Sequence, residues 1–140
     1  YYLHSHGIIH GDVKPGNLII QPWDHNAFLV DYGLSVIKPK HASMRVGYTE
    51  VFTAPEMKQG KPPLPESDIY GLGQTMIYTL GGDPIAKTLP DYIPLPLRDF
   101  YLELVQHNPL DRPNWEKEDL VKKLSDIRYK VFGRRHTREK

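Results

Sequence analysis

Two short apolar runs near the start of the 140-residue chain constrain its fold more than any other feature. Leu18-Ile19-Ile20 and Phe28-Leu29-Val30 are rich in strand-forming residues, and a turn-rich segment, 21–26, separates them. We therefore predict a two-stranded antiparallel hairpin. Asn17 comes directly before the first run and Asp31 directly after the second, so strand pairing would bring these two oxygen-bearing side chains together.

Apolar residues at helical spacing predict that most of the remaining regular structure is helical. The predicted helices cover Ser67–Leu80, Leu97–Gln106 and a stretch that begins at Asn114, a residue type that caps helices well. Gly71 and Gly73 lie inside the first of these helices, where each glycine costs about 1 kcal/mol relative to alanine. We therefore expect another part of the chain to pack closely there. Residues 34–53 have weak periodicity and are interpreted as a loop.

The composition excludes several kinds of protein. The chain has no cysteine, so disulfides, thiolate chemistry and cysteine-based zinc sites are impossible. Its net charge of +1 does not favour a nucleic-acid partner. No apolar run approaches the ~18 residues that span a bilayer, so we expect no membrane segment here and, by default, a cytoplasmic location. Residues 133–140 form a basic tail, which we expect to be a solvated end.

Three short polar motifs follow one another in the first half of the chain. His10-Gly11-Asp12-Val13-Lys14-Pro15-Gly16-Asn17 precedes the hairpin, Asp31-Tyr32-Gly33 follows it, and Ala54-Pro55-Glu56 comes later. Either of the last two motifs alone would be a common sequence without functional meaning. Their order and spacing behind the complete first motif resemble the C-terminal lobe of eukaryotic-type protein kinases. The resemblance extends over residues 1–132.

The resemblance implies a mainly α fold, with a small antiparallel β-hairpin carrying the catalytic and metal-binding loops. It also implies a serine/threonine-protein kinase, a transferase that uses ATP and Mg²⁺ and acts on protein substrates. The 140-residue sequence contains no Gly-rich phosphate loop, strand lysine or partner glutamate. We therefore expect a truncated kinase domain that is inactive alone. Gly11 stands where the family commonly has an arginine that receives a loop phosphate, so we expect no such switch.

The resemblance also assigns roles to individual residues of the site. Asp12 matches the catalytic aspartate that orients the substrate hydroxyl and accepts its proton. Lys14 matches the cation that contacts the transferring phosphate of the nucleotide. Asn17 and Asp31 match the two positions that hold Mg²⁺, and through it ATP. Thr49 matches the threonine that touches the catalytic aspartate and lysine in Ser/Thr kinases.

A further set of residues matches structural positions of the family. This set is His10, Tyr32, Gly33, Glu56, Asp68 and Arg112. Glu56 and Arg112 match partners in a buried ion pair. Asp68 matches an aspartate that accepts hydrogen bonds from amides of the catalytic loop. His10 matches a residue that packs beneath the Asp31–Gly33 motif, in which Tyr32 replaces the usual phenylalanine.

Two other functions remain open at this point. Small-molecule phosphotransferases resembling aminoglycoside and choline kinases also carry His-Gly-Asp-x-x-x-x-Asn. They usually have histidine where this chain has Lys14, and they lack the motifs around Glu56 and Arg112. The second alternative is a non-catalytic, kinase-like scaffold. The presence of Asp12 and Asn17 with Asp31 argues against it, since a scaffold has no chemical need for all three.

Overall fold

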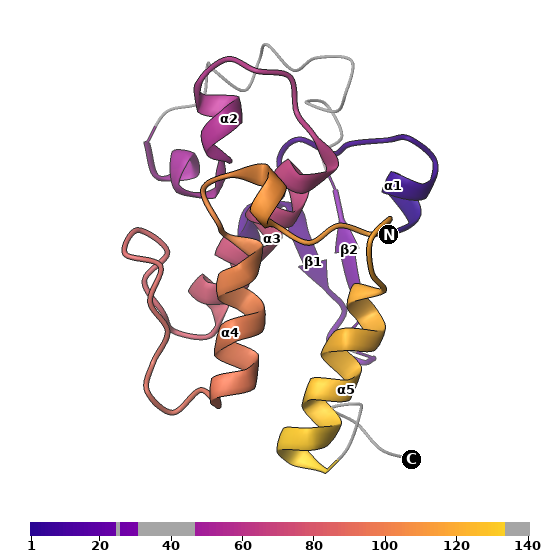
Figure 1. Cartoon of the computed structure of the whole chain (residues 1–140), viewed down its shortest axis with the longest axis vertical. Helices are drawn as coiled ribbons and strands as arrows, with labels where there is room; N and C mark the ends of the chain where they lie inside the picture. Colours follow the sequence, from indigo (N-terminus) through magenta and orange to yellow (C-terminus); the bar gives the residue numbers. More distant parts are fainter. Residues whose placement is uncertain (25, 31–46, 134–140) are drawn as a thin grey trace.

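The computed structural model describes residues 1–24, 26–30 and 47–133, and of residues 47–49 only the backbone. The described part is mostly helical with one two-stranded antiparallel sheet, as the sequence predicts. With η marking 3₁₀ helices, its elements are α1 (Tyr2–Ser5), η1 (Pro15–Asn17), β1 (Leu18–Ile20), β2 (Ala27–Leu29), η4 (Gly47–Phe52), α2 (Pro55–Lys58), α3 (Pro65–Thr79), α4 (Leu95–Leu104), η5 (Pro109–Asp111) and α5 (Leu120–Phe132). Figure 1 shows α1 and the hairpin on one side of α3 and α4, and the long α3–α4 connection on the other. No helix in these ranges is long and apolar enough to cross a membrane.

The predicted hairpin is confirmed. Leu18 pairs with Leu29, and Ile20 pairs with Ala27, in an antiparallel register. The Asp24 side chain accepts a hydrogen bond from the backbone N–H of Asn26, which is the side-chain-to-backbone contact typical of a tight turn. The hairpin therefore returns the chain to the loop that precedes it, which is the property that positions the candidate site.

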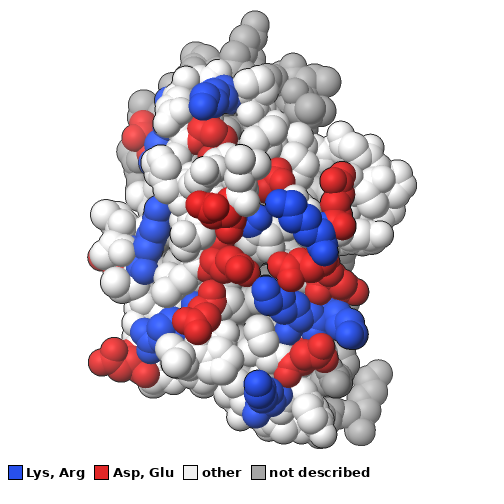
Figure 2. Space-filling model, in the orientation of Figure 1, with Lys and Arg blue, Asp and Glu red and all other residues white. Residues whose placement is uncertain are grey.

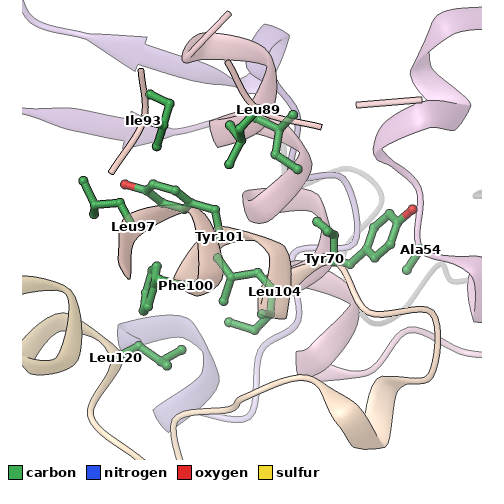
Figure 3. Packing of buried hydrophobic residues seen from close by; sticks show 12 residues of the cluster. Ala54, Tyr70, Leu89, Ile93, Leu97, Phe100, Tyr101, Leu104 and Leu120 are labelled. Atoms are coloured by element: carbon green, nitrogen blue, oxygen red, sulfur yellow. The ribbon is translucent and has the colours of Figure 1, made fainter. Parts of the chain in front are cut away.

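The core lies between the three long helices, with α4 packed against both α3 and α5. The buried cluster contains Ala54, Ile69, Tyr70, Ile77, Leu89, Ile93, Leu97, Phe100, Tyr101, Leu104, Val105 and Leu120. Figure 3 shows α4 residues such as Phe100 and Leu104 between residues of the neighbouring elements. Helix α3 is buried along most of its length, including polar residues such as Gln74 and Thr75. It is thus the central element on which the other parts are arranged.

The predicted start of the last helix is wrong. Helix α5 begins at Leu120, and Asp119 caps it by accepting a hydrogen bond from the Lys122 N–H. Asn114 instead accepts hydrogen bonds from the N–H groups of Glu116 and Lys117, so it caps an isolated turn. The same side-chain contact serves turns and helices alike, which is why the sequence could not distinguish them.

The loop predicted for residues 34–53 is also partly wrong. Residues 47–52 form the 3₁₀ helix η4, which packs against α3. A 3₁₀ helix this short leaves almost no periodic pattern in a sequence. Residues 31–46 lie outside the described residues.

Charged side chains of both signs lie interspersed on the face shown in Figure 2. Lys123, for example, contacts Glu103 at 3.1 Å and Glu118 at 3.4 Å. These two pairs are half exposed, so each contributes little to stability. The face shown carries no broad basic surface of the kind that binds nucleic acid, which agrees with the near-neutral composition.

The surroundings of Gly71 explain why the interior of α3 contains a glycine. A Cβ added at Gly71 would lie 2.5 Å from the carbonyl oxygen of Val13, a backbone atom between Asp12 and Lys14. Gly71→Ala is expected to lower the free energy of unfolding by about 1–3 kcal/mol, although alanine normally favours a helix. Urea unfolding of the variant measures this effect. Gly16→Ala, where an added Cβ meets nothing within 4 Å, is the matched control and should unfold like the parent.

Candidate active site

Asp68 on α3 holds the start of the candidate catalytic loop. Its Oδ2 accepts the backbone N–H of His10 and its Oδ1 accepts that of Gly11, both at 2.8 Å. Gly11 has a φ of 83°, in the left-handed region that glycine adopts most easily. The interaction predicted for Asp68 is therefore confirmed. The sharp turn before Asp12 is anchored to the buried central helix.

His10 connects the loop to the hairpin. The backbone N–H of Asp12 donates to His10 Nδ1 at 3.1 Å, so Nδ1 is the acceptor nitrogen and Nε2 carries the proton. Nε2 then donates to the carbonyl oxygen of Val30 at 2.8 Å. The His10 side chain is completely buried, so this arrangement has little room to change. His10 acts as a positioning residue between the two segments.

Asp12, Lys14 and Asn17 come together at the end of the loop. The Asn17 side-chain nitrogen donates to Oδ2 of Asp12 at 3.0 Å and to its backbone oxygen at 2.8 Å. Lys14 Nζ lies 3.9 Å from Asp12 Oδ2. Asp12 and Asn17 are buried, whereas the Lys14 side chain is 23% exposed. The Asp12 carboxylate and the Lys14 ammonium group thus lie close together, and only Lys14 is partly exposed to solvent.

Val30 brings the end of the hairpin back to Asn17. Its N–H donates to the Asn17 carbonyl at 2.9 Å, while its own carbonyl accepts from His10. Both polar backbone groups of the residue before Asp31 are therefore bound to the candidate catalytic loop. Asp31, Tyr32 and Gly33 themselves lie outside the described residues, so their predicted roles stay predictions.

Thr49 is placed only through its backbone. It lies in η4, the 3₁₀ helix that ends shortly before Ala54. Its side chain is not described, and the predicted contact with Asp12 and Lys14 stays a prediction.

The side-chain oxygen of Asn17 is suited to bind magnesium. Because its nitrogen makes two hydrogen bonds to Asp12, the orientation of the amide is determined and Oδ1 remains as an acceptor. No described residue donates to this oxygen, and Mg²⁺ takes few protein ligands, chiefly oxygen atoms. The described residues contain no cluster of three or more His, Asp or Glu side chains that could bind a metal by themselves.

An open pocket begins at this group. It has a volume of about 710 Å³, and its walls include Lys14, Asn17 and the α3–α4 connection at Asp83. The edge-to-face pair of Phe52 and Tyr78, whose ring centroids lie 6.2 Å apart, contributes to the same walls. A space of this size accommodates a small molecule or several residues of a peptide beside Lys14 and Asn17.

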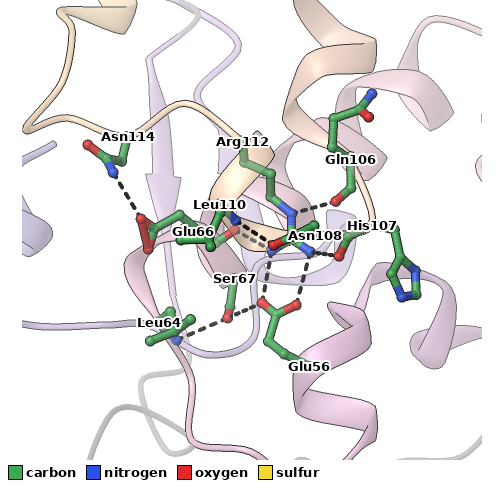
Figure 4. A network of polar contacts seen from close by, with 10 residues as sticks. All are labelled: Glu56, Leu64, Glu66, Ser67, Gln106, His107, Asn108, Leu110, Arg112 and Asn114. Atoms are coloured by element: carbon green, nitrogen blue, oxygen red, sulfur yellow. Dashed lines mark hydrogen bonds and ion pairs between the residues drawn. The ribbon is translucent and has the colours of Figure 1, made fainter.

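The predicted Glu56–Arg112 ion pair is confirmed, and it belongs to a larger network of hydrogen bonds. Arg112 Nη1 and Nη2 donate to the two carboxylate oxygens of Glu56 at 2.8 and 2.9 Å (Figure 4). The remaining Arg112 N–H groups donate to the carbonyl oxygens of Gln106, Glu66 and His107. Ser67 Oγ donates to Glu56 at 2.6 Å. The network joins α2, the start of α3 and the segment after α4.

Two polar residues of the site region, the partly buried His4 and the buried Gln74, were missed by the sequence analysis. His4 Nε2 contacts Asp68 Oδ2 at 2.8 Å, and the amide nitrogen of Gln74 donates to the carbonyl oxygens of Val51 and Pro84. The available signal for Gln74 was weak: it lies one turn after Tyr70 on the buried side of α3. For His4, which stands in a one-turn helix, no periodic pattern was available.

Asp68→Asn tests the anchoring of the loop. The substitution keeps the shape of the side chain but places an NH₂ group against buried N–H donors. We expect the free energy of unfolding to fall by about 1–3 kcal/mol, because at least one buried donor loses its acceptor. Denaturant unfolding measures the change. Asp99→Asn, on the exposed side of α4, should stay within about 0.5 kcal/mol of the parent; a similar value for Asp68→Asn would contradict the anchoring.

The helical lobe, its hairpin and this loop are compatible with a kinase-like catalytic domain. Comparison with known families gives the same result, since the profile described as "Protein kinase domain" matches residues 1–118. The chain belongs to the protein kinase family.

Individual relatives are also kinases. The chain is 38% identical over 89 residues to serine/threonine-protein kinase D of Synechocystis sp., with 56% of this chain and 17% of the relative covered. It is 34% identical over 105 residues to the dual specificity protein kinase zak2 of Dictyostelium discoideum, covering 67% and 16%. It is 32% identical over 133 residues to Aurora kinase of Schizosaccharomyces pombe, covering 83% and 37%. The chain thus spans well under half the length of each of these relatives.

Proposed function

We propose that the complete polypeptide containing this chain transfers the γ-phosphoryl group of ATP to Ser and Thr hydroxyls of proteins. The observation that carries the proposal is the convergence of Asp12, Lys14 and Asn17, held by hydrogen bonds to α3 and to the hairpin. A carboxylate beside a cation and an amide oxygen suits phosphoryl transfer, in which positioning and charge stabilisation supply most of the catalysis. The family membership and the kinase relatives support the proposal.

Asp12 would orient the acceptor hydroxyl and take its proton. The carboxylate is buried, but its contacts Lys14 and Asn17 line the open pocket, and we expect the hydroxyl group to approach from that side. The hydrogen bond from Asn17 limits rotation of the carboxylate, and the bond from the Asp12 N–H to His10 holds the backbone. Such preorganisation would keep the carboxylate in position to act as a general base.

Lys14 and Asn17 would bind the nucleotide. Lys14 Nζ is near enough to Asp12 to contact a phosphoryl group as it passes to the hydroxyl, where its charge offsets the charge on the transferring oxygens. Asn17 would hold Mg²⁺ through Oδ1, together with Asp31. Bound Mg²⁺ and ATP supply the phosphoryl group and neutralise the charge of its oxygens.

The preference for Ser and Thr follows from Lys14 and Thr49, which match the family's Ser/Thr positions. The serine/threonine kinases among the relatives agree with this preference. One relative is named as a dual specificity kinase, so tyrosine is included as a comparison acceptor in the test. The boundary of the domain at residue 132 stays a prediction, as does the role of the basic tail, residues 133–140.

The proposal is tested with the complete polypeptide and radiolabelled ATP. Three peptides that differ only in a Ser, Thr or Tyr acceptor are compared with choline and an aminoglycoside, in the presence and absence of Mg²⁺. We expect Mg²⁺-dependent labelling of the Ser and Thr peptides. Labelling of the small alcohols alone would assign the small-molecule phosphotransferase function, and the absence of all labelling, with ATP bound, would favour the scaffold.

A further inference from the structure

A second pocket adjoins the one at the candidate active site. It has a volume of about 450 Å³ and lies between α2, α3 and the connection that follows α3. Val51, Pro84 and Ile85 form walls of both pockets, so one ridge separates them. A peptide bound with its hydroxyl at Asp12 can therefore continue across this ridge into the second pocket. The residues there would contact the substrate a few positions from the acceptor.

The position of the ridge is defined by hydrogen bonds from the buried Gln74 side chain. The Gln74 amide nitrogen donates to Val51 O at 2.9 Å and to Pro84 O at 2.8 Å, which ties η4 to the α3–α4 connection. Gln74 is 1% exposed, so its amide group is shielded from water. Asp83 and Thr88 exchange two backbone hydrogen bonds and close the loop between them. The second pocket is thus bordered by segments with fixed positions.

The second pocket is lined by basic side chains and by no acidic one. Lys58, Lys87 and His107 contribute to its walls, and none of the lining residues is Asp or Glu. Among the described residues, neither Lys58 nor Lys87 forms an ion pair. Figure 4 shows the His107 ring directed away from the Arg112 network, in which only its carbonyl takes part. The positive charge of this pocket is therefore available to a ligand.

Lys87 is the more constrained of the two lysines in this lining. Its φ of 57° is unusual for a residue other than glycine, and its Nζ lies 5.1 Å from the centre of the Tyr70 ring. Burial, and next the charge of Arg112, lower the pKa of Lys87 below its ordinary value. An anion bound beside Lys87 would favour its charged form again. The site is consequently suited to a negatively charged group.

We propose that this basic pocket selects protein substrates with an anionic side chain, a carboxylate or a phosphate, a few residues from the acceptor hydroxyl. Lys87 is the specificity-determining residue, and Lys58 assists it from the end of α2. This inference rests on the proposed function, since it assumes that the first pocket receives the acceptor. It adds the chemical class of the preferred protein substrate.

The test uses the complete polypeptide and Ser peptides in which one position at a time, on either side of the acceptor, is Glu, phosphoserine, Gln or Lys. We expect a higher kcat/KM for the Glu or phosphoserine peptides over the Gln peptides at positions on one side only. Which anion gives the larger value distinguishes acidic from previously phosphorylated substrates. Lys87→Gln should remove the preference, a fall of about five- to tenfold in kcat/KM, mainly through KM, while the Gln peptides are unaffected.

Lys61→Gln is the control, since Lys61 is exposed and outside the lining of this pocket. Equal use of Glu and Gln peptides by the parent would overturn the inference, as would an equal loss for both peptides in Lys87→Gln. Fluorescence anisotropy of the labelled peptides measures binding without turnover. If no peptide is phosphorylated, the proposed function fails, and anisotropy still decides the inference: acidic peptides must bind more tightly than neutral ones, and Lys87→Gln must abolish the difference.

Discussion

Replacing Asp12 with asparagine is expected to lower kcat of the complete polypeptide by about 10²- to 10⁴-fold. The substitution keeps the size of the side chain but removes its ability to accept a proton. Asn17 can still donate to the remaining carbonyl oxygen and to the Asp12 backbone oxygen, so the loop should keep its shape. We expect the KM for ATP to change much less than kcat, since Asp12 is assigned to the acceptor and not to the nucleotide. Steady-state kinetics with radiolabelled ATP measures both values.

Denaturant unfolding provides the control for this result. Asp12→Asn should unfold within about 0.5 kcal/mol of the parent if the residue acts in chemistry and not in folding. Asp99→Asn, exposed on α4, should change neither activity nor stability. A variant that keeps more than a tenth of the parental kcat would remove Asp12 from the role of general base.

Replacing Arg112 with methionine is expected to destabilise the lobe by about 3–5 kcal/mol, because the Glu56 carboxylate would stay buried without its ionic partner. The Arg112 side chain is fully buried and Glu56 is 5% exposed. Arg112→Lys should recover only part of the loss, since a lysine cannot reproduce the bidentate contact or the bonds to the surrounding carbonyl groups. Thermal unfolding should show a decrease in Tm of roughly 10–20 °C for the methionine variant.

The pair also predicts how stability depends on pH. Burial raises the pKa of Glu56, but hydrogen bonds from Arg112 and Ser67 outweigh it, and the pKa lies below its ordinary value of 4.5. A group with a lowered pKa stabilises the folded state above its unfolded pKa, and this stabilisation is lost as the pH falls through the folded pKa. Stability should therefore decrease below about pH 4.5. The double variant Glu56→Gln/Arg112→Met should lack the pH-dependent stabilisation that Glu56 supplies. It should also be more stable than Arg112→Met alone. Equal stabilities of the two variants would show that the unpaired carboxylate is not the cause.

The sequence predicted those parts of the structure that depend on local patterns or on side chains with one chemical role. The hairpin followed from two apolar runs and a turn, and its topology alone placed the end of β2 beside Asn17. The glycines of α3 indicated a close approach before Val13 was known to be the neighbour. The Glu56–Arg112 pair came from the family resemblance and not from the pattern of residues.

The parts that escaped prediction are determined by contacts between distant segments. In the sequence Gln74 looks like an ordinary helix residue. Its role depends on Val51 and Pro84, which are 23 and 10 residues away and come close to it only when the chain folds. The left-handed backbone of Lys87 carries no signal in the sequence, because such conformations are expected at glycine. The same holds for the position of η4, where local propensity is weak.

The separation between Glu56 and Arg112 has a consequence for the synthesis of the chain. The partners are 56 residues apart, and translation at about 5–20 residues per second leaves the carboxylate without its arginine for roughly 3–11 s. During this interval α2 and α3 can form, but burying Glu56 beside Ser67 would leave a charge without compensation. We therefore expect the nascent lobe to stay open until Arg112 has emerged. A residue that is translated late in the lobe thus controls when the segments before it can close.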